Sequence, residues 1–547
     1  MTAEPVVNSG DFTARMDADG WICDIAFSGI QILDAIYAVP RELDWETPPT
    51  TATIGELSGG NALTARFEAQ TPGARVRWTV AIRTIGDGLE IRFEATCDSP
   101  VDLKRFGLVL LHTETTKIAG ISSDTRPIPA IWPARIAPGP LFSQARELNL
   151  HTAQGIVHIG FDSPTETEDH RNWSDPGWKT YFPPLCEGNV HLDPHDPIEY
   201  TITLKGHRAS GPSPHLTHPR PGHRAEASVA VGGGFLNRPK LGTQVFSFSN
   251  EEGDVVAGYG LDFVLVRTHI ATAIGQLELA YAFGERYRAR VDFQVLVPPN
   301  ASSADVMAVA RVAADASDRV TVQPFGQQEL ATTRALMGVF GDSAGGSALY
   351  YAELNRAPHL DQLGTVVFGA ASQVHQGGTA WMLRTPPVMD RQIEDARRQY
   401  PGARIGLMPL VMTSLTRARD GRDADPRYDT PIAAGWLAGV LYGTAGADEV
   451  SVLRATGPAG LETEGSPTPA GALLQSHMRP DARIVPIATE GRVLALATDD
   501  GRSRKLTVAN ADRKPVRVAI REPSGLFPET LELAAWQVET FSSDGFG

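Results

Sequence analysis

The chain has 547 residues, of which 42% are hydrophobic and 21% charged, and its formal net charge is −15. One hydrophobic core does not grow to this length, so the sequence predicts about two to four domains. The negative charge argues against nucleic acid or an anionic membrane surface as a partner, because both bind a basic face.

The N-terminus and the cysteines indicate the compartment. No apolar run reaches the length that a bilayer requires. The N-terminal MTAEPVVNSGDF lacks the basic and apolar regions of a signal peptide. Cys23, Cys97 and Cys186 are odd in number, far apart and without metal-ligand spacing. This pattern indicates buried free thiols in a reducing compartment, so we expect a cytoplasmic protein.

From residue 12 to about 205 the chain shows short strands with alternating polarity. Residues 74–84, 89–97 and 106–114 alternate or run apolar, with turn residues between them. No long amphipathic helix interrupts them, so the sequence predicts an antiparallel β-sandwich.

One segment of this region, ETEDHRNWSDPGWKTY at 166–181, combines aromatic and polar side chains. Aromatic faces beside hydrogen-bonding groups suit sugars, whose C–H faces stack and whose hydroxyls need partners. We expect this segment to cover the rim of the next domain; a solvated loop held by its tryptophans is the equally weighted alternative. The candidate substrate-binding residues are Asp169, Arg171, Asn172, Trp173, Asp175 and Lys179.

Residues 206–238 are rich in Pro, His, Gly and Ser and are typical of a linker. From 239 to 456, strands alternate with helical patterns such as 303–316, 389–400 and 432–446. This alternation favours a (β/α)8 barrel over an open sheet, and no G-x-G-x-x-G follows the first strand. The eight expected strands are 242–246, 262–267, 291–297, 320–325, 337–341, 365–370, 404–411 and 449–454.

After about residue 465 the β pattern returns. The sequence therefore predicts a multidomain α/β plus β protein in three parts. These are an N-terminal β-sandwich at 1–225, a central TIM-like barrel at 226–465 and a small C-terminal β-domain at 466–547.

In a barrel, chemistry is carried by polar residues just past the strand C-termini. The stretch LMGVFGDSAGGSALYYAELNR at 336–356 has this form. Each such residue could equally have a structural role, and the gathering of these residues at one rim is the informative feature. The catalytic candidates are Glu353, His375 and Asp342, and the substrate-binding candidates at the rim are Arg267, Gln323, Asn355 and Gln373.

A glycosidase needs two carboxylates that face each other across the bond. The expected fourth strand carries Gln323 and Phe325, and the seventh ends in Leu410 and Val411, so neither offers an acid. One general base with cations that hold an oxyanion suits hydrolysis of an activated ester better. We expect no metal and no cofactor.

Four segments resemble the D-apionate lactonase family: EDHRNWSDPGWKTY at 168–181, GDSAGGSALYYAELNR at 341–356, SQVH at 372–375 and DPRYDTPIAAGWLAGVL at 425–441. The resemblance implies the same three parts and an enzyme that opens the lactone of apionate in apiose catabolism. The chain departs from the family pattern at the end of the eighth strand, where Arg454 and its neighbours replace a glutamate, and at Ser347-Ala348.

The sequence thus predicts a hydrolase that opens a sugar-acid lactone. Glu353 is the expected general base or acid, while Arg171 and His375 are expected to polarise the carbonyl. A furanoside hydrolase, with Asp169 or Asp175 as its second acid, and a non-catalytic sugar-binding protein are the alternatives. The expected partner is a small carbohydrate or sugar lactone, and the oligomeric state, a homo-oligomer included, stays open.

Overall fold

The computed structural model describes residues 5–56, 62–113, 117–123, 127–128, 132–184, 188–209, 225–298, 301–314, 320–326, 344–347, 349–356, 363–374, 377–415 and 425–543. The chain forms two compact units. The first unit comprises 1–170 and 177–221, and the second comprises 171–176 and 222–547.

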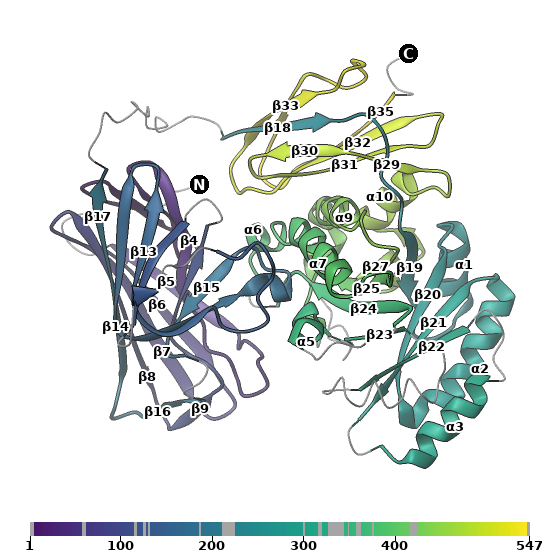
Figure 1. Cartoon of the computed structure of the whole chain (residues 1–547), viewed down its shortest axis with the longest axis horizontal. Coiled ribbons are helices and arrows are strands. Elements are labelled where there is room, and N and C mark those ends of the chain that lie inside the picture. The colour runs from purple at the N-terminus through teal and green to yellow at the C-terminus, as the bar shows by residue number, and fades with distance from the viewer. Residues whose placement is uncertain are drawn as a thin grey trace. The chain divides into compact units, whose positions relative to one another are not determined.

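The first unit is built from β-strands (Figure 1). Its strands are β1(Val6–Ser9), β2(Phe12–Met16), β3(Ile22–Phe27), β4(Ile30–Ala38), β5(Thr50–Glu56), β6(Ala62–Gln70), β7(Arg75–Ile85), β8(Gly88–Cys97), β9(Val101–Leu103), β10(Leu108–His112), β11(Lys117–Ser123), β12(Pro127–Ile128), β13(Phe142–Thr152), β14(Gly155–Asp169), β15(Trp178–Tyr181), β16(Val190–Leu192) and β17(Ile198–Arg208).

Hydrogen-bonded neighbours follow the order β1-β2-β3-β4-β10-β15-β14-β17-β8-β7-β6-β5. Buried and exposed residues alternate along β7, as expected where one face of a strand packs on a core. Phe12 and Phe27, near one end of this path, share a core with Trp78 and Phe93, near the other end. The sheet therefore curls around a single core, and its antiparallel pairing agrees with the pattern of the sequence.

Segment 166–181 is not a solvated loop. It comprises the end of β14, the 3-10 helix η1(His170–Trp173) and β15, and most of its side chains are buried. Residues 171–176 cluster with the second unit.

The second unit contains the expected alternation of strands and helices. Its parallel strands are β19(Lys240–Gln244), β20(Phe263–His269), β21(Arg290–Val297), β22(Val320–Gly326), β23(Ala344–Gly346), β24(Thr365–Ala371), β25(Arg404–Val411) and β26(Glu449–Thr456). Its helices are α1(Asn250–Gly258), α2(Ile270–Tyr287), α3(Ser303–Ala314), α5(Tyr351–Arg356), α6(Thr379–Met382), α7(Pro386–Gln399), η3(Pro426–Asp429) and α9(Pro431–Gly443). The strand expected at 337–341 lies outside the described residues.

These strands are ordered β22-β21-β20-β19-β26-β25-β24-β23. In the described part of the chain the ladder ends at β22 and at β23, and these two end strands contact each other. Apolar side chains fill one face of the sheet, among them Phe263, Leu265, Val367 and Met408. The apolar helix α9 is buried along nearly its whole length, which explains its lack of a polar face.

Two further sheets follow, and one of them includes β18, a strand from a distant part of the sequence. The remaining elements are β18(Ala225–Val231), β27(Gly460–Thr463), β28(Ser466–Pro467), α10(Pro469–His477), β29(Arg483–Val485), β30(Ile487–Glu490), β31(Val493–Asp499), β32(Arg504–Asn510), β33(Val516–Arg521), β34(Thr530–Leu533) and β35(Val538–Ser542). The sheets are β30-β18-β33-β34 and β29-β31-β32-β35. Val229 of β18 is buried in the same core as Val508 and Val518, so this strand, which precedes the parallel sheet in the chain, is part of the C-terminal β-structure.

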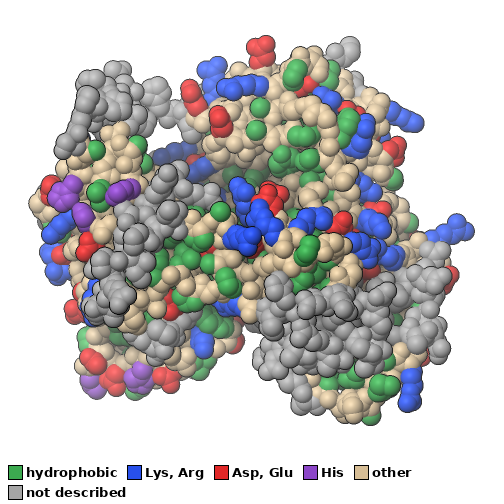
Figure 2. Space-filling model, in the orientation of Figure 1, with side chains coloured by type: hydrophobic (Ala, Val, Ile, Leu, Met, Phe, Trp, Pro, Cys, Tyr) green, Lys and Arg blue, Asp and Glu red, His purple; other side chains and the backbone are tan. Residues whose placement is uncertain are grey.

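No helix in the described ranges has both the length and the apolar character needed to cross a membrane. On the face shown in Figure 2, basic and acidic side chains are interspersed.

Candidate functional site

Polar side chains near the carboxyl ends of neighbouring parallel strands share one face of the sheet. Arg267 of β20 is in register with Gln294 of β21. Gln244, the last residue of β19, is in register with Arg454 of β26. Because register partners point to the same face, these residues lie on the face that also carries Phe263 and Leu265.

These four side chains carry guanidinium groups, on Arg267 and Arg454, and amide groups, on Gln244 and Gln294. Gln294 is fully buried and Gln244 is 5% exposed. Within the described residues, Nε2 of Gln244 is buried without a hydrogen-bond partner, which is costly unless a ligand supplies one. The Arg454 guanidinium lies 4.7 Å from the ring centroid of Phe246, a side chain that is 45% exposed just past β19.

Glu353 occupies a helix-capping position. It is the third residue of α5, and its Oε2 accepts a hydrogen bond from the Tyr350 backbone N at 2.8 Å and from Ser347 Oγ at 3.4 Å. This is one half of a capping box. Burial raises the pKa of the Glu353 carboxyl, although backbone N–H groups and Arg356 oppose that rise. A carboxyl with a raised pKa is suited to proton transfer as well as to capping.

Asn355 and Asn172 are held together by direct contact. The Asn355 Nδ2 donates to Asn172 Oδ1 at 2.9 Å, and Gln399 Nε2 donates to Asn355 Oδ1 at 2.8 Å. The side-chain amides of Asn355 and Asn172 therefore help to link α5, α7 and the 171–176 segment.

The rest of the 171–176 segment contacts the same two helices. The Arg171 carbonyl accepts from Gln392 Nε2 at 2.6 Å. The Arg356 guanidinium stacks on the Trp173 ring at 4.8 Å from its centroid. Arg171 and Asp175 are both buried.

Gln373 belongs to a polar network after β24. Its Nε2 donates to Asp425 Oδ2 at 2.8 Å and its Oε1 accepts from Arg427 Nη2 at 3.0 Å, while Arg427 also pairs with Asp425 at 2.5 Å. Burial alone would raise the pKa of Asp425, but the bonds from Arg427 and Gln373 lower it to about 2.

Two of the expected binding residues lie in the first unit. Asp169 Oδ2 accepts from the Ala137 backbone N at 3.0 Å, and Lys179 is buried on β15 in register with Glu168. Asp342, His375 and the side chain of Gln323 lie outside the described residues.

Gln244, Gln294, Asp425 and Arg427 were not among the site residues expected from the sequence. The first two had a visible signal, since each is a single amide in an apolar strand, GTQVF and VDFQVLV. Asp425 and Arg427 lie in one of the motifs, but nothing in their spacing shows that they bind Gln373.

The opposite edge of the parallel sheet is ionic. Arg290 pairs with Asp292 at 3.0 Å and with Glu449 at 2.8 Å, and Arg404 pairs with Glu449 at 3.2 Å. Burial raises the pKa of Asp292 to about 6 against the charge of Arg290. Since these groups satisfy one another at the amino ends of the strands, they indicate a role in stability. Across the described positions, no three His, Cys, Asp or Glu side chains are grouped as metal ligands.

Comparison with known proteins bears on the N-terminal region. Residues 2–209 match the model of the N-terminal domain of D-apionate lactonase. The D-apionate lactonase of Brucella anthropi is 24% identical over 184 residues, which cover 31% of this chain and 29% of that protein. The match thus spans less than a third of the relative's length.

Solved structures show only a distant likeness. A family 30 glycoside hydrolase, an endoxylanase from Clostridium papyrosolvens, is 12% identical with a TM-score of 0.38, covering 58% of this chain and 99% of its own. An α-L-arabinofuranosidase from Thermotoga maritima is 11% identical with a TM-score of 0.38, covering 58% and 98%. Both TM-scores are too low to bear on fold or activity. Over residues 2–209, therefore, the chain is similar to the D-apionate lactonases, which confirms the resemblance carried by the motif at 168–181.

Proposed function

We propose that the protein hydrolyses the lactone of a sugar acid, of the D-apionolactone kind, to the free acid. One observation carries the proposal: Arg267 and Gln294, and beside them Gln244 and Arg454, gather on one face near the strand carboxyl ends. These groups supply several N–H donors for a carbonyl oxygen, a carboxylate and sugar hydroxyls. The similarity of the N-terminal domain to D-apionate lactonases supports the same substrate class.

In the proposed reaction, water adds to the lactone carbonyl carbon and the ring C–O bond breaks. The guanidinium groups of Arg267 and Arg454 hold the oxyanion that forms on the carbonyl oxygen. Glu353 takes the proton of the attacking water and returns it to the departing ring oxygen, so that a hydroxy acid is released. Phe246, exposed beside Arg454, offers a face on which the sugar carbons stack.

We also propose that the parallel sheet closes into a (β/α)8 barrel through β22 and β23, whose contact supports it. In that fold the carboxyl ends of the strands form the active face. Cys23 and Cys97 are buried free thiols, which supports the proposal of a reducing compartment such as the cytoplasm and a place in apiose breakdown.

Purified Arg267→Met tests the role of the arginine directly. Release of acid from sugar-acid γ-lactones should fall by roughly 10²–10³-fold, because one oxyanion donor is lost. Arg521→Gln, which changes an exposed residue of β33, is the control and should retain full turnover. Full turnover by Arg267→Met would show that this face does not hold the substrate.

A further inference from the structure

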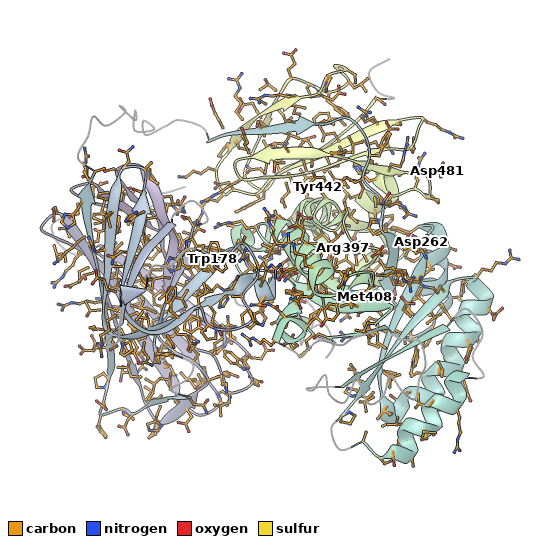
Figure 3. All side chains as sticks on the ribbon, in the orientation of Figure 1. Trp178, Asp262, Arg397, Met408, Tyr442 and Asp481 are labelled. Carbon is orange, nitrogen blue, oxygen red and sulfur yellow. The ribbon has the colours of Figure 1, made fainter. Side chains whose placement is uncertain are left out.

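A cavity of about 620 Å³ lies in the second unit, between the amino ends of the parallel strands, helices α7 and α9, and strand β31. Lys240 begins β19 and Asp448 directly precedes β26, so the cavity is at the edge of the sheet opposite the candidate site. Its volume is in the range of small-molecule sites, roughly 300–1,000 Å³. Figure 3 labels two lining residues, Arg397 of α7 and Tyr442 of α9.

The cavity has two cationic donors that its own acids do not use. Arg238 is fixed through Nη2, which donates to Asp262 Oδ2 at 3.1 Å. Asp262 also accepts from the Leu241 backbone N at 2.8 Å, so it holds the guanidinium from one side. Nη1 of Arg238 is buried and makes no hydrogen bond to any described residue. Lys240, an exposed residue, lines the same cavity.

The other charged groups of the cavity are an ion pair, Arg397 with Asp448, and the carboxylate of Asp390. Arg397 Nη2 donates to Asp448 Oδ2 at 3.0 Å and to the Gly446 carbonyl at 2.7 Å, so this pair neutralises itself. Asp390 lines the cavity without belonging to that pair. Its carboxylate can accept hydrogen bonds from hydroxyl groups.

The remaining wall is apolar. Leu494, Ile487 and Pro387 line the cavity beside Tyr442. The Tyr442 hydroxyl is already occupied, because it donates to the Ile487 carbonyl at 2.5 Å and accepts from the Ile487 backbone N at 3.1 Å. A bound molecule therefore meets the tyrosine as an apolar surface.

We propose that this cavity is a second small-molecule site, separate from the candidate active site, and that it binds a hydroxylated organic acid. The carboxylate of the ligand is bound by Arg238 and Lys240, its hydroxyls donate to Asp390, and its carbon chain packs on Leu494 and Ile487. Sugar acids have this combination of groups. The proposal does not depend on the reaction proposed above.

Isothermal titration of the full-length protein with D-gluconate as the probe tests the site. We expect saturable binding that weakens at least about tenfold in Arg238→Gln and in Lys240→Gln, since each variant removes a charged hydrogen-bond donor. Arg521→Gln is the matched control and should bind as the unaltered protein does. Gln244→Leu, at the candidate active site, should also retain this binding, which distinguishes the two sites.

Two results would overturn the proposal. One is the absence of gluconate binding to the unaltered protein, and the other is equal binding by the unaltered protein and both cavity variants. If Arg238→Gln does not fold, Lys240→Gln decides alone, because its side chain is exposed and its loss leaves the packing unchanged.

Discussion

At the scale of single residues, the capping contact of Glu353 can be separated from the proton transfer that we propose for it. Its carboxylate caps α5 through the Tyr350 backbone N–H, and its raised pKa suits it to move a proton. A glutamine has the same shape and can still accept the capping bond, but it cannot transfer a proton.

Glu353→Gln should therefore lower turnover of a sugar lactone by roughly 10²–10⁴-fold and leave the melting temperature nearly unchanged. Glu353→Leu is the control for capping, and it should also cost about 0.5–2 kcal/mol of stability. Steady-state kinetics and thermal unfolding of both variants provide the comparison. Wild-type turnover by Glu353→Gln would show that Glu353 only caps α5 and does not transfer a proton in the reaction.

For Arg171, too, a role in the reaction must be distinguished from a role in holding the 171–176 segment in place. If Arg171 polarises the lactone carbonyl, as expected from the sequence, Arg171→Met should lower turnover by roughly 10²–10³-fold. Arg356→Met is the matched control, since it removes the cation stacked on Trp173 of the same segment. It should lower the melting temperature with turnover per folded molecule intact. If Arg171→Met behaves like Arg356→Met in both measurements, Arg171 only fixes the segment.

At the scale of elements, helix α9 packs closely on the start of α7 because it carries glycines. A Cβ added at Gly443 would lie 2.3 Å from the Pro386 carbonyl oxygen, and one at Gly439 would lie 3.0 Å from the Pro386 Cβ. The first of these contacts is with backbone, which cannot rotate away, so a side chain at this position must separate the helices.

Gly443→Ala should destabilise the protein by about 1–3 kcal/mol through this overpacking. Gly275→Ala is the matched control within α2, where an added Cβ meets nothing within 4 Å. It should stabilise the protein by about 0.5–1 kcal/mol, because alanine restricts the unfolded chain. Chemical denaturation measures both, and equal effects of the two changes would contradict the packing described.

The sequence predicts some of these strands and helices well, but not how distant strands pair. Local patterns predicted strands and helices such as β25 and α7 nearly to the residue, because apolar periodicity and breakers are local. The pairing of β18 with β30 and β33 was not predictable, since it joins residues more than 250 apart in the chain and no local feature specifies the partner. The binding of Asp425 by Gln373 likewise depends on how the chain returns in space, because 52 residues separate the two side chains.

At the scale of the whole molecule, buried histidines should contribute to the loss of stability in acid. His477 is enclosed between two hydroxyls, with Nδ1 2.8 Å from Thr498 Oγ1 and Nε2 2.8 Å from Thr507 Oγ1. Burial, assisted by the charge of Lys505, lowers the pKa of His477 to about 3. An unfolded histidine has a pKa of about 6.5, so between these values only the unfolded chain takes up the proton.

Stability should therefore be unaffected by this group above pH of about 6.5 and fall with decreasing pH below it, by up to about 1.4 kcal/mol per pH unit. His477→Gln should flatten this part of the profile. His112, whose pKa burial also lowers to about 3, would retain a similar slope in the variant. Denaturation midpoints between pH 4 and 8, which is about the range in which histidine titrates, provide the measurement. Identical profiles for the variant and the unaltered protein would contradict the assignment.

We propose that the protein is a sugar-lactone hydrolase. The most direct test is to incubate the purified full-length protein with a panel of sugar-acid lactones and, in parallel, with aryl furanosides, and to follow acid and phenol release. We expect acid release from at least one lactone well above its spontaneous rate, and no phenol release. Phenol release without lactone opening would contradict the account and indicate a glycosidase. Binding of a sugar lactone without either reaction would indicate a sugar-binding protein.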